Sequence, residues 1–83
     1  MGLQLQCAYY RLRTRAHRLG HLGEAYVFGV AEREAGLYAT DPSPEQWAEL
    51  HSTYEARMAA SFTEEERTAW AEAIHLCELA QKS

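Results

Sequence analysis

Residues that branch at Cβ are scarce in this chain of 83 amino acids. Valine, isoleucine and threonine together occupy only eight positions, whereas alanine alone occupies fourteen and leucine nine. Branching at Cβ favours strands, while Ala, Leu, Glu, Gln and Arg favour helices. The composition therefore predicts a mainly helical protein before any periodicity is considered.

Long apolar runs are also missing, since no stretch approaches the roughly 18 residues of a membrane-spanning helix. The first residues contain no hydrophobic signal core. Apolar residues make up 47% of the chain and charged residues 24%, as is typical of globular proteins. We therefore expect a soluble, unexported protein of the cytoplasm, or of the host-cell cytoplasm if a phage encodes it, with no membrane partner.

Signatures of catalysis are absent as well. The chain contains no Gly-rich phosphate loop, no nucleophile elbow G-x-S-x-G and no C-x-x-C pair. A domain of this size buries only about 60–65% of its unfolded surface, so an enclosed pocket for a substrate would hollow out its core. We expect one domain over residues 1–83 that is not an enzyme and has no cofactor.

Acidic residues are absent from residues 1–23, although the chain carries twelve of them and a net charge of −4. The first 23 residues carry four arginines and a net charge of +4, and the remainder carries −8. Such a split is typical of a polar interaction surface. It divides the domain into a basic half (1–39) and an acidic half (43–82).

The acidic half contains two helix starts. Ser43 and Gln46 form a capping box with Pro44 at the first helical position, and Thr63 and Glu66 repeat the box. Apolar residues follow these caps at helical spacing: Trp47, Leu50, Tyr54, Met58 and Phe62, then Trp70, Ala73, Ile74, Leu76 and Cys77. Because the link between the two helices is short, we predict an antiparallel αα-hairpin over residues 43–82.

Trp47, Leu50 and Tyr54 form the pattern W-x2-L-x3-Y, which resembles the first-helix signature of the tetratricopeptide repeat. The resemblance covers eight residues, and the pattern does not recur one repeat length upstream. We interpret it as a shared way of packing an αα-hairpin, with Trp47 and Tyr54 in the core.

The basic half favours two further helices. Apolar residues recur at helical spacing over residues 3–19 and again over 24–39, with the punctuating sequence GHLG between them. Gly29 and Gly36 count against the second helix, because each costs about 1 kcal/mol in a helix interior. The predicted fold is all-α, a compact four-helix domain built from two αα-hairpins.

A different fold remains open for the basic half. Arg11, Arg13 and Arg15 alternate with Leu12 and Thr14, which is the period of a strand, and "AYVFGVA" reads as a short buried strand. The alternative is therefore an α+β fold, in which an N-terminal β-hairpin precedes the two-helix hairpin.

The stretch "YYRLRTRAHRLGH" (9–21) is the candidate partner surface. Basic side chains interleaved with aromatics can neutralise phosphates and stack on bases, but proteins that bind nucleic acid are usually basic as whole domains. This chain is acidic, so we expect contact with the carboxylates of a larger protein, or a plain solvated face, ahead of nucleic-acid binding. The candidate residues are Tyr9, Tyr10, Arg11, Arg13, Arg15 and Arg18.

The histidines provide a weaker metal hypothesis. His17, His21 and Glu24 read H-x3-H-x2-E, a spacing that places three metal-ligand types on one helical face, although glycines interrupt the segment. His51 and His75 fall at similar heights in the expected hairpin, which makes a shared site conceivable. Exposed or half-buried histidines without a metal are the default interpretation.

The two cysteines test the expected topology. Cys7 lies near the start of the first expected helix and Cys77 near the end of the last. In an up-down-up-down bundle these helices are antiparallel neighbours. We therefore expect the cysteines to approach each other or share a core layer, as reduced thiols rather than a disulfide.

These observations lead to an ordered set of functional hypotheses. The first is a non-enzymatic protein–protein interaction module, a small regulator or inhibitor of a larger protein, for example a phage or mobile-element inhibitor of a nucleic-acid-handling complex. The alternatives are a polyanion-binding accessory protein that uses residues 9–21 and, weaker still, a histidine-ligated metal-binding protein. A homodimer is a further expectation, because nine aromatic residues are more than one small core covers. The candidates for that interface are Tyr9, Tyr10, Tyr26, Tyr38 and Trp47.

Overall fold

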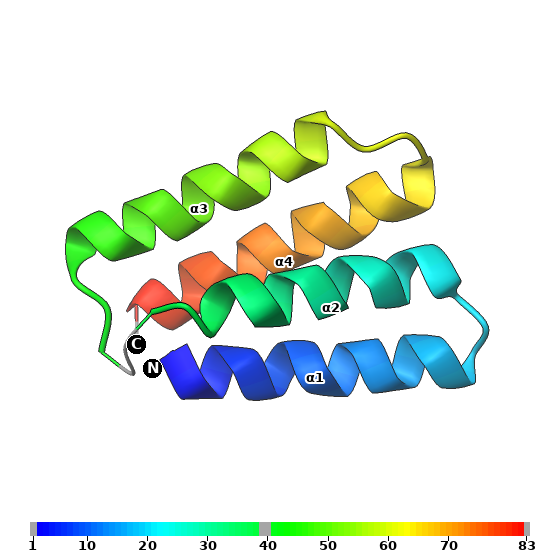
Figure 1. Ribbon diagram of the computed structural model, residues 1–83, viewed down its shortest axis with the longest axis horizontal. Coiled ribbons are helices and arrows are strands. Elements are labelled where there is room, and N and C mark those ends of the chain that lie inside the picture. The colour runs from blue at the N-terminus through cyan, green and yellow to red at the C-terminus, as the bar shows by residue number, and fades with distance from the viewer. Residues whose placement is uncertain (1, 39–40, 83) are drawn as a thin grey trace.

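A computed structural model describes residues 2–38 and 41–82, and within these ranges the chain forms four α-helices and no strand. They are α1 (Gly2–Arg18), α2 (Leu22–Ala35), α3 (Pro44–Ala59) and α4 (Glu64–Lys82) (Figure 1). The predicted four-helix fold is confirmed. The α+β alternative is wrong, because the alternating arginines lie within α1 and "AYVFGVA" lies within α2. Helix propensity outweighs this short local alternation.

The sequence-encoded caps of α3 and α4 are present in the structure. The Gln46 N–H donates to the Ser43 hydroxyl at 3.2 Å, and the Ser43 N–H donates to the Gln46 side chain at 2.9 Å. At α4 the Glu66 N–H donates to the Thr63 hydroxyl at 3.1 Å. These bonds satisfy backbone donors that have no partner within the helix, and so they determine where each helix begins.

The turn between α1 and α2 depends on a glycine in the left-handed region. Gly20 has a φ of 76°, which L-residues rarely adopt. Its N–H donates to the His17 carbonyl oxygen at 3.1 Å, and the His21 N–H reaches back to the Ala16 carbonyl oxygen at 2.9 Å. This pair of bonds is a Schellman motif, and it ends α1 and reverses the chain.

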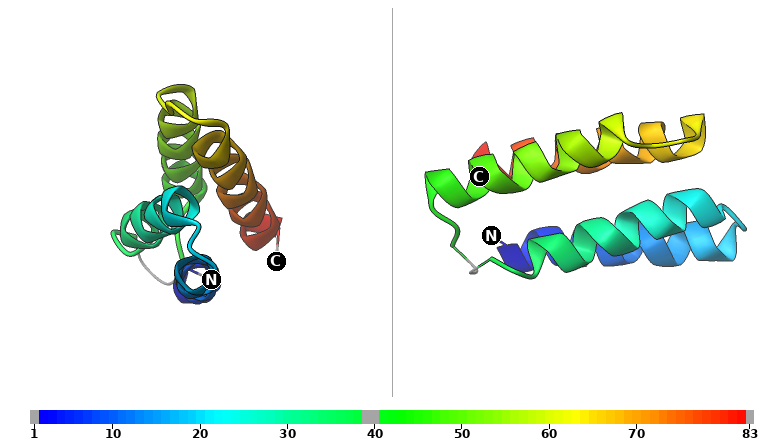
Figure 2. Two further views of the ribbon diagram at one scale, coloured as in Figure 1. Left: turned by 90° about the vertical axis from the view of Figure 1, so that its right-hand side faces the viewer. Right: turned by 45° about the horizontal axis from the view of Figure 1, so that its top comes forward.

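The four helices form two packed hairpins. Figure 1 shows the start of α1 and the end of α4 at one end of the bundle, and both hairpin links at the other. The two further views in Figure 2 show the α1–α2 pair in one layer and the α3–α4 pair in the second. Helix α4 packs against both α1 and α2, so the core lies between the two hairpins. None of the described helices has the length and apolarity that crossing a membrane requires.

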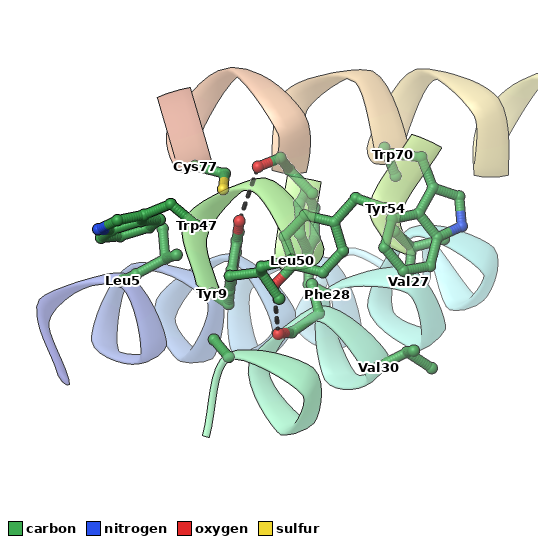
Figure 3. Close-up of a cluster of buried hydrophobic side chains, with 14 residues drawn as sticks. Leu5, Tyr9, Val27, Phe28, Val30, Trp47, Leu50, Tyr54, Trp70 and Cys77 are labelled. Carbon is green, nitrogen blue, oxygen red and sulfur yellow. Dashed lines mark hydrogen bonds between the residues drawn. The ribbon is translucent and has the colours of Figure 1, made fainter. Parts of the chain in front are cut away.

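Aromatic rings fill the centre of this core (Figure 3). The Tyr9 ring lies 6.4 Å from Phe28 and 5.9 Å from Tyr54, measured between centroids. The Tyr54 ring lies 5.6 Å from that of Trp70. One chain of ring contacts therefore joins all four helices, which makes these side chains the main apolar contribution to stability.

Both core tyrosines bury their hydroxyls with a partner. The Tyr9 hydroxyl donates to the Ala73 carbonyl oxygen of α4 at 2.6 Å, and the Tyr54 hydroxyl donates to the Ala31 carbonyl oxygen of α2 at 2.7 Å. Burial raises the pKa of both phenols far above that of an exposed tyrosine. Each bond links one hairpin to the other, and no buried side-chain polar atom in the described residues lacks a partner.

The two cysteines do not share a core layer, so that part of the prediction is wrong. Cys77 is fully buried, whereas Cys7 is exposed, and both thiols are free. Leu5 and Tyr9 belong to the inner stripe of α1, and the residue midway between them faces the opposite side of the helix. Burial raises the pKa of the Cys77 thiol to about 11, so it stays protonated at neutral pH and is a poor nucleophile.

The aromatic residues divide into core and surface. Tyr9 and Trp47 are buried, so neither is available to a dimer interface, and Tyr38 is half-buried. The remaining two candidates, Tyr10 and Tyr26, are exposed.

The predicted inner stripe of α3 is wrong at its last member, since α3 ends before Phe62. That side chain is 93% exposed.

Candidate functional site

The outer face of α1 carries arginines without an internal partner. Arg11, Arg15 and Arg18 are exposed, and helical spacing places them on one face. Within the described part of the chain, their side chains make no hydrogen bond and no ion pair. The twelve acids of the chain therefore leave these three cations unpaired.

Arg13, in contrast, makes contacts with other side chains of the molecule. Its Nε donates to Glu32 Oε1 at 3.0 Å, and its guanidinium lies 5.1 Å from the centre of the Tyr10 ring. The side-chain stem crosses Gly29, where an added Cβ would lie 3.1 Å from Arg13 Cδ. The glycine that weakens α2 as an isolated helix therefore allows α1 and α2 to approach closely.

Of the two candidate tyrosines, only Tyr10 belongs to this surface. Tyr10 is 52% exposed beside Arg13, whereas Tyr9 points into the core. Adjacent residues of a helix differ by about 100° in direction, so Tyr10 points to a different side of α1 from Tyr9. Burial takes Tyr9 out of the candidate partner surface.

The structure separates the residues of the metal hypothesis. His21 Nδ1 lies 3.4 Å from Glu24 Oε2, while His17 belongs to α1 on the other side of the Gly20 turn. No three His, Cys, Asp or Glu side chains among residues 2–38 and 41–82 are grouped in a way that could hold a metal ion.

His51 is the histidine with the strongest contacts. Its Nε2 lies 3.0 Å from Glu78 Oε2 of α4, and its Nδ1 lies 3.2 Å from Glu55 Oε1 of its own helix. The carboxylates meet opposite edges of the ring, so they hold the imidazole rather than share a metal with it. The hydrogen bond to Glu78, with the charges of both glutamates, raises the pKa of His51 above its ordinary value. His75 is exposed and its side chain makes no such contact.

This arrangement predicts a pH-dependent contribution to stability. Since the folded-state pKa of His51 is raised, its contribution is fully present below the unfolded value of about 6.5 and is lost as the pH rises through the folded value. The pairs are partly exposed, so we expect less than about 1 kcal/mol. Urea unfolding of the native protein and of His51→Gln should differ at about pH 6 and converge near pH 9. His75→Gln is the control, and an equal difference at both pH values would contradict the prediction.

A groove runs between α1 and α2. Its volume is about 550 Å³, and Leu22 and Tyr26 stand at its rim with 67% and 60% of their surface exposed. A second groove of about 450 Å³ lies on the other side of Tyr26, beside Phe62 and Trp70. Tyr26 therefore forms a ridge between two hollows. Sequence reasoning missed Leu22 and Arg33 here, because their position at the groove depends on how α1 packs against α2.

The chain matches no model of a protein family, and the comparisons with curated proteins and with solved structures produce no match.

Proposed function

We propose that this protein is a non-enzymatic interaction module of the cytoplasm that regulates or inhibits a larger protein by covering part of its surface. The observation that carries the proposal is the set of unpaired, exposed cations Arg11, Arg15 and Arg18 in a chain with twelve acids. An exposed guanidinium binds a carboxylate in a bidentate geometry, which gives an interface both orientation and specificity. The α1 face is therefore a surface for a partner that presents carboxylates.

Carboxylates suit this surface better than a phosphate backbone does. Arg15 lines a hollow of about 450 Å³ with four glutamates: Glu24, Glu64, Glu65 and Glu72. A nucleic-acid strand that followed the arginines would meet this acidic group at close range and be repelled. A folded protein can present a few carboxylates to Arg11, Arg15 and Arg18 while its outline avoids the acids.

The test compares two variants of equal net charge. Arg11→Gln, Arg15→Gln and Arg18→Gln together lower the net charge by three units, and Gln81→Glu with Lys82→Glu lower it by the same amount at the end of α4. Affinity capture from the source cell should recover a stoichiometric partner with the native protein and with the α4 variant. The α1 variant should lose it, with a reduction in affinity of at least about tenfold.

Two results would contradict the proposal. One is the absence of any stoichiometric partner, and the other is a partner that the α1 variant retains. The polyanion alternative is measured separately by fluorescence anisotropy of a labelled mixed-sequence nucleic acid at about 50 and about 200 mM salt. We expect no saturable binding; salt-sensitive binding that the α1 variant loses would replace the protein partner with a nucleic acid.

A further inference from the structure

The groove between α1 and α2 has an apolar floor. Ala25, Gly29 and Val30 line it, and the Arg13 stem crosses it at Gly29. The rim residues Leu22 and Tyr26 are exposed over 67% and 60% of their surface. Hydrophobic rims around a hollow of this size are typical of sites that receive the apolar side chains of a partner.

The charges around this groove are mainly positive. Arg13 and His17 reach it from α1 and Arg33 from α2, and Glu32 is its single acidic lining residue. Glu32 is already bonded to Arg13 at 3.0 Å. The side chains of His17 and Arg33 are exposed and make no hydrogen bond or ion pair with the described residues. The groove therefore combines an apolar floor with unpaired positive charge, in a protein whose net charge is −4.

We propose that this groove binds an acidic amphipathic helix of the partner, an inference that rests on the proposed function. One or two large apolar side chains of that helix enter between Leu22 and Tyr26. Its flanking carboxylates pair with Arg33 and, when His17 is protonated, with that imidazole. This is the helix-in-groove mode of recognition, in which apolar residues spaced three or four apart serve as anchors.

The charge distribution favours an acidic helix in this groove over a second copy of the chain and over a nucleic acid. A second copy of the chain docked on this face about a two-fold axis would oppose two faces that each carry the unpaired Arg33, and like charges across an interface are unfavourable. A nucleic acid gains little from the apolar floor, because most of its hydrogen bonds with proteins go to phosphate and sugar. An acidic helix uses both the floor and the charge.

The test is an unbiased selection on the full-length native protein. A random library of peptides of roughly 16 residues, about 24 Å long as helices, is panned against it. The enriched pool should carry a net negative charge, with Leu, Phe, Trp or Tyr at spacings of three or four. A fluorescently labelled peptide from that pool should bind Tyr26→Ala and Arg33→Glu at least about tenfold more weakly than it binds the native protein.

Matched controls separate this site from general charge and hydrophobicity. Leu79→Ala removes another exposed apolar side chain, and Lys82→Glu makes the same charge reversal on α4. Both controls should bind the peptide as the native protein does. Because Tyr26 and Arg33 are exposed, their variants should also keep the native helical circular dichroism spectrum. The spectrum is recorded for every variant before its binding is measured.

Several outcomes would contradict the proposal that this groove binds an acidic helix. These are a pool of basic peptides, no enrichment, or a peptide that binds the native protein and both groove variants equally. Binding of a labelled single-stranded RNA that Arg33→Glu abolishes would assign the groove to nucleic acid. A dimer in sedimentation that Tyr26→Ala dissociates would assign it to a second copy. A cellular partner lost by the α1 arginine variant but kept by both groove variants would leave the proposed function intact and overturn only this inference.

Discussion

Tyr9→Ala should lower the free energy of unfolding by about 3–5 kcal/mol, the range for removing a buried aromatic ring. The ring is fully buried between Phe28 and Tyr54, so its loss leaves a cavity where the two hairpins meet. Its hydroxyl also links α1 to Ala73 of α4. A domain of this length has only about 4–12 kcal/mol of stability in total. We therefore expect the variant to lose a large share of its stability and to unfold at a lower urea concentration than the native protein.

Urea denaturation followed by circular dichroism measures this effect, with two control variants. Tyr9→Phe keeps the ring and removes the hydroxyl, so it should cost only about 1 kcal/mol. Tyr10→Ala changes the exposed neighbour and should stay within about 1 kcal/mol of the native protein. If Tyr9→Ala unfolded at the native urea midpoint, the ring would lie outside the core and the packing described for α1 would be incorrect.

The sequence alone could not show which of Tyr9 and Tyr10 is buried. A helical period places Tyr9 and Tyr10 about 100° apart, and both then read as aromatic residues beside a basic stretch. Which of the two is buried depends on where α2 and α4 pack, and that is a non-local property. The caps at Ser43 and Thr63 were predictable because each depends on side chains only three residues apart.

The candidate partner surface was also only partly predictable from the sequence. The arginines of α1 could be found from the sequence because they stand in one acid-free stretch. The pairing of Arg13 with Glu32 could not, since nineteen residues separate the two. Gly29 counted against α2 as a helix, yet in the structure it gives the Arg13 stem room to cross. Local helix propensity does not predict this effect, because the contact that offsets the cost of Gly29 comes from another helix.

Some of the arginines are paired within the molecule and others are not. Arg13 and Arg57 join elements through their bonds to Glu32 and Glu34, while the outer arginines of α1 remain free. The stability of the fold does not depend on pairing these arginines, because an exposed ion pair contributes at most about 1 kcal/mol. Charge left unpaired on a surface instead supports fast and selective association with a complementary partner.

Trp70→Ala is the second substitution with a large expected effect, again about 3–5 kcal/mol. Trp70 is 3% exposed, and its ring lies 5.6 Å from that of Tyr54, which itself contacts Tyr9. Truncation therefore breaks the chain of ring contacts and extends the hollow beside Tyr26 into the core. Far-UV circular dichroism is the appropriate probe in urea, because the substitution also removes one of the two tryptophan fluorophores.

Phe62→Ala is the matched control for Trp70→Ala. The sequence pattern gives both aromatics an inner position, but the Ser61 N–H bonds to the Met58 carbonyl oxygen at 3.2 Å, so the chain turns away before Phe62 can complete the α3 stripe. Since Phe62 is almost fully exposed, its truncation should change the free energy of unfolding by no more than about 0.5 kcal/mol. A loss as large as that of Trp70→Ala would mean that Phe62 folds back onto the bundle in solution. An unchanged stability with weaker partner binding would instead extend the partner surface across the Tyr26 ridge to the α3–α4 link.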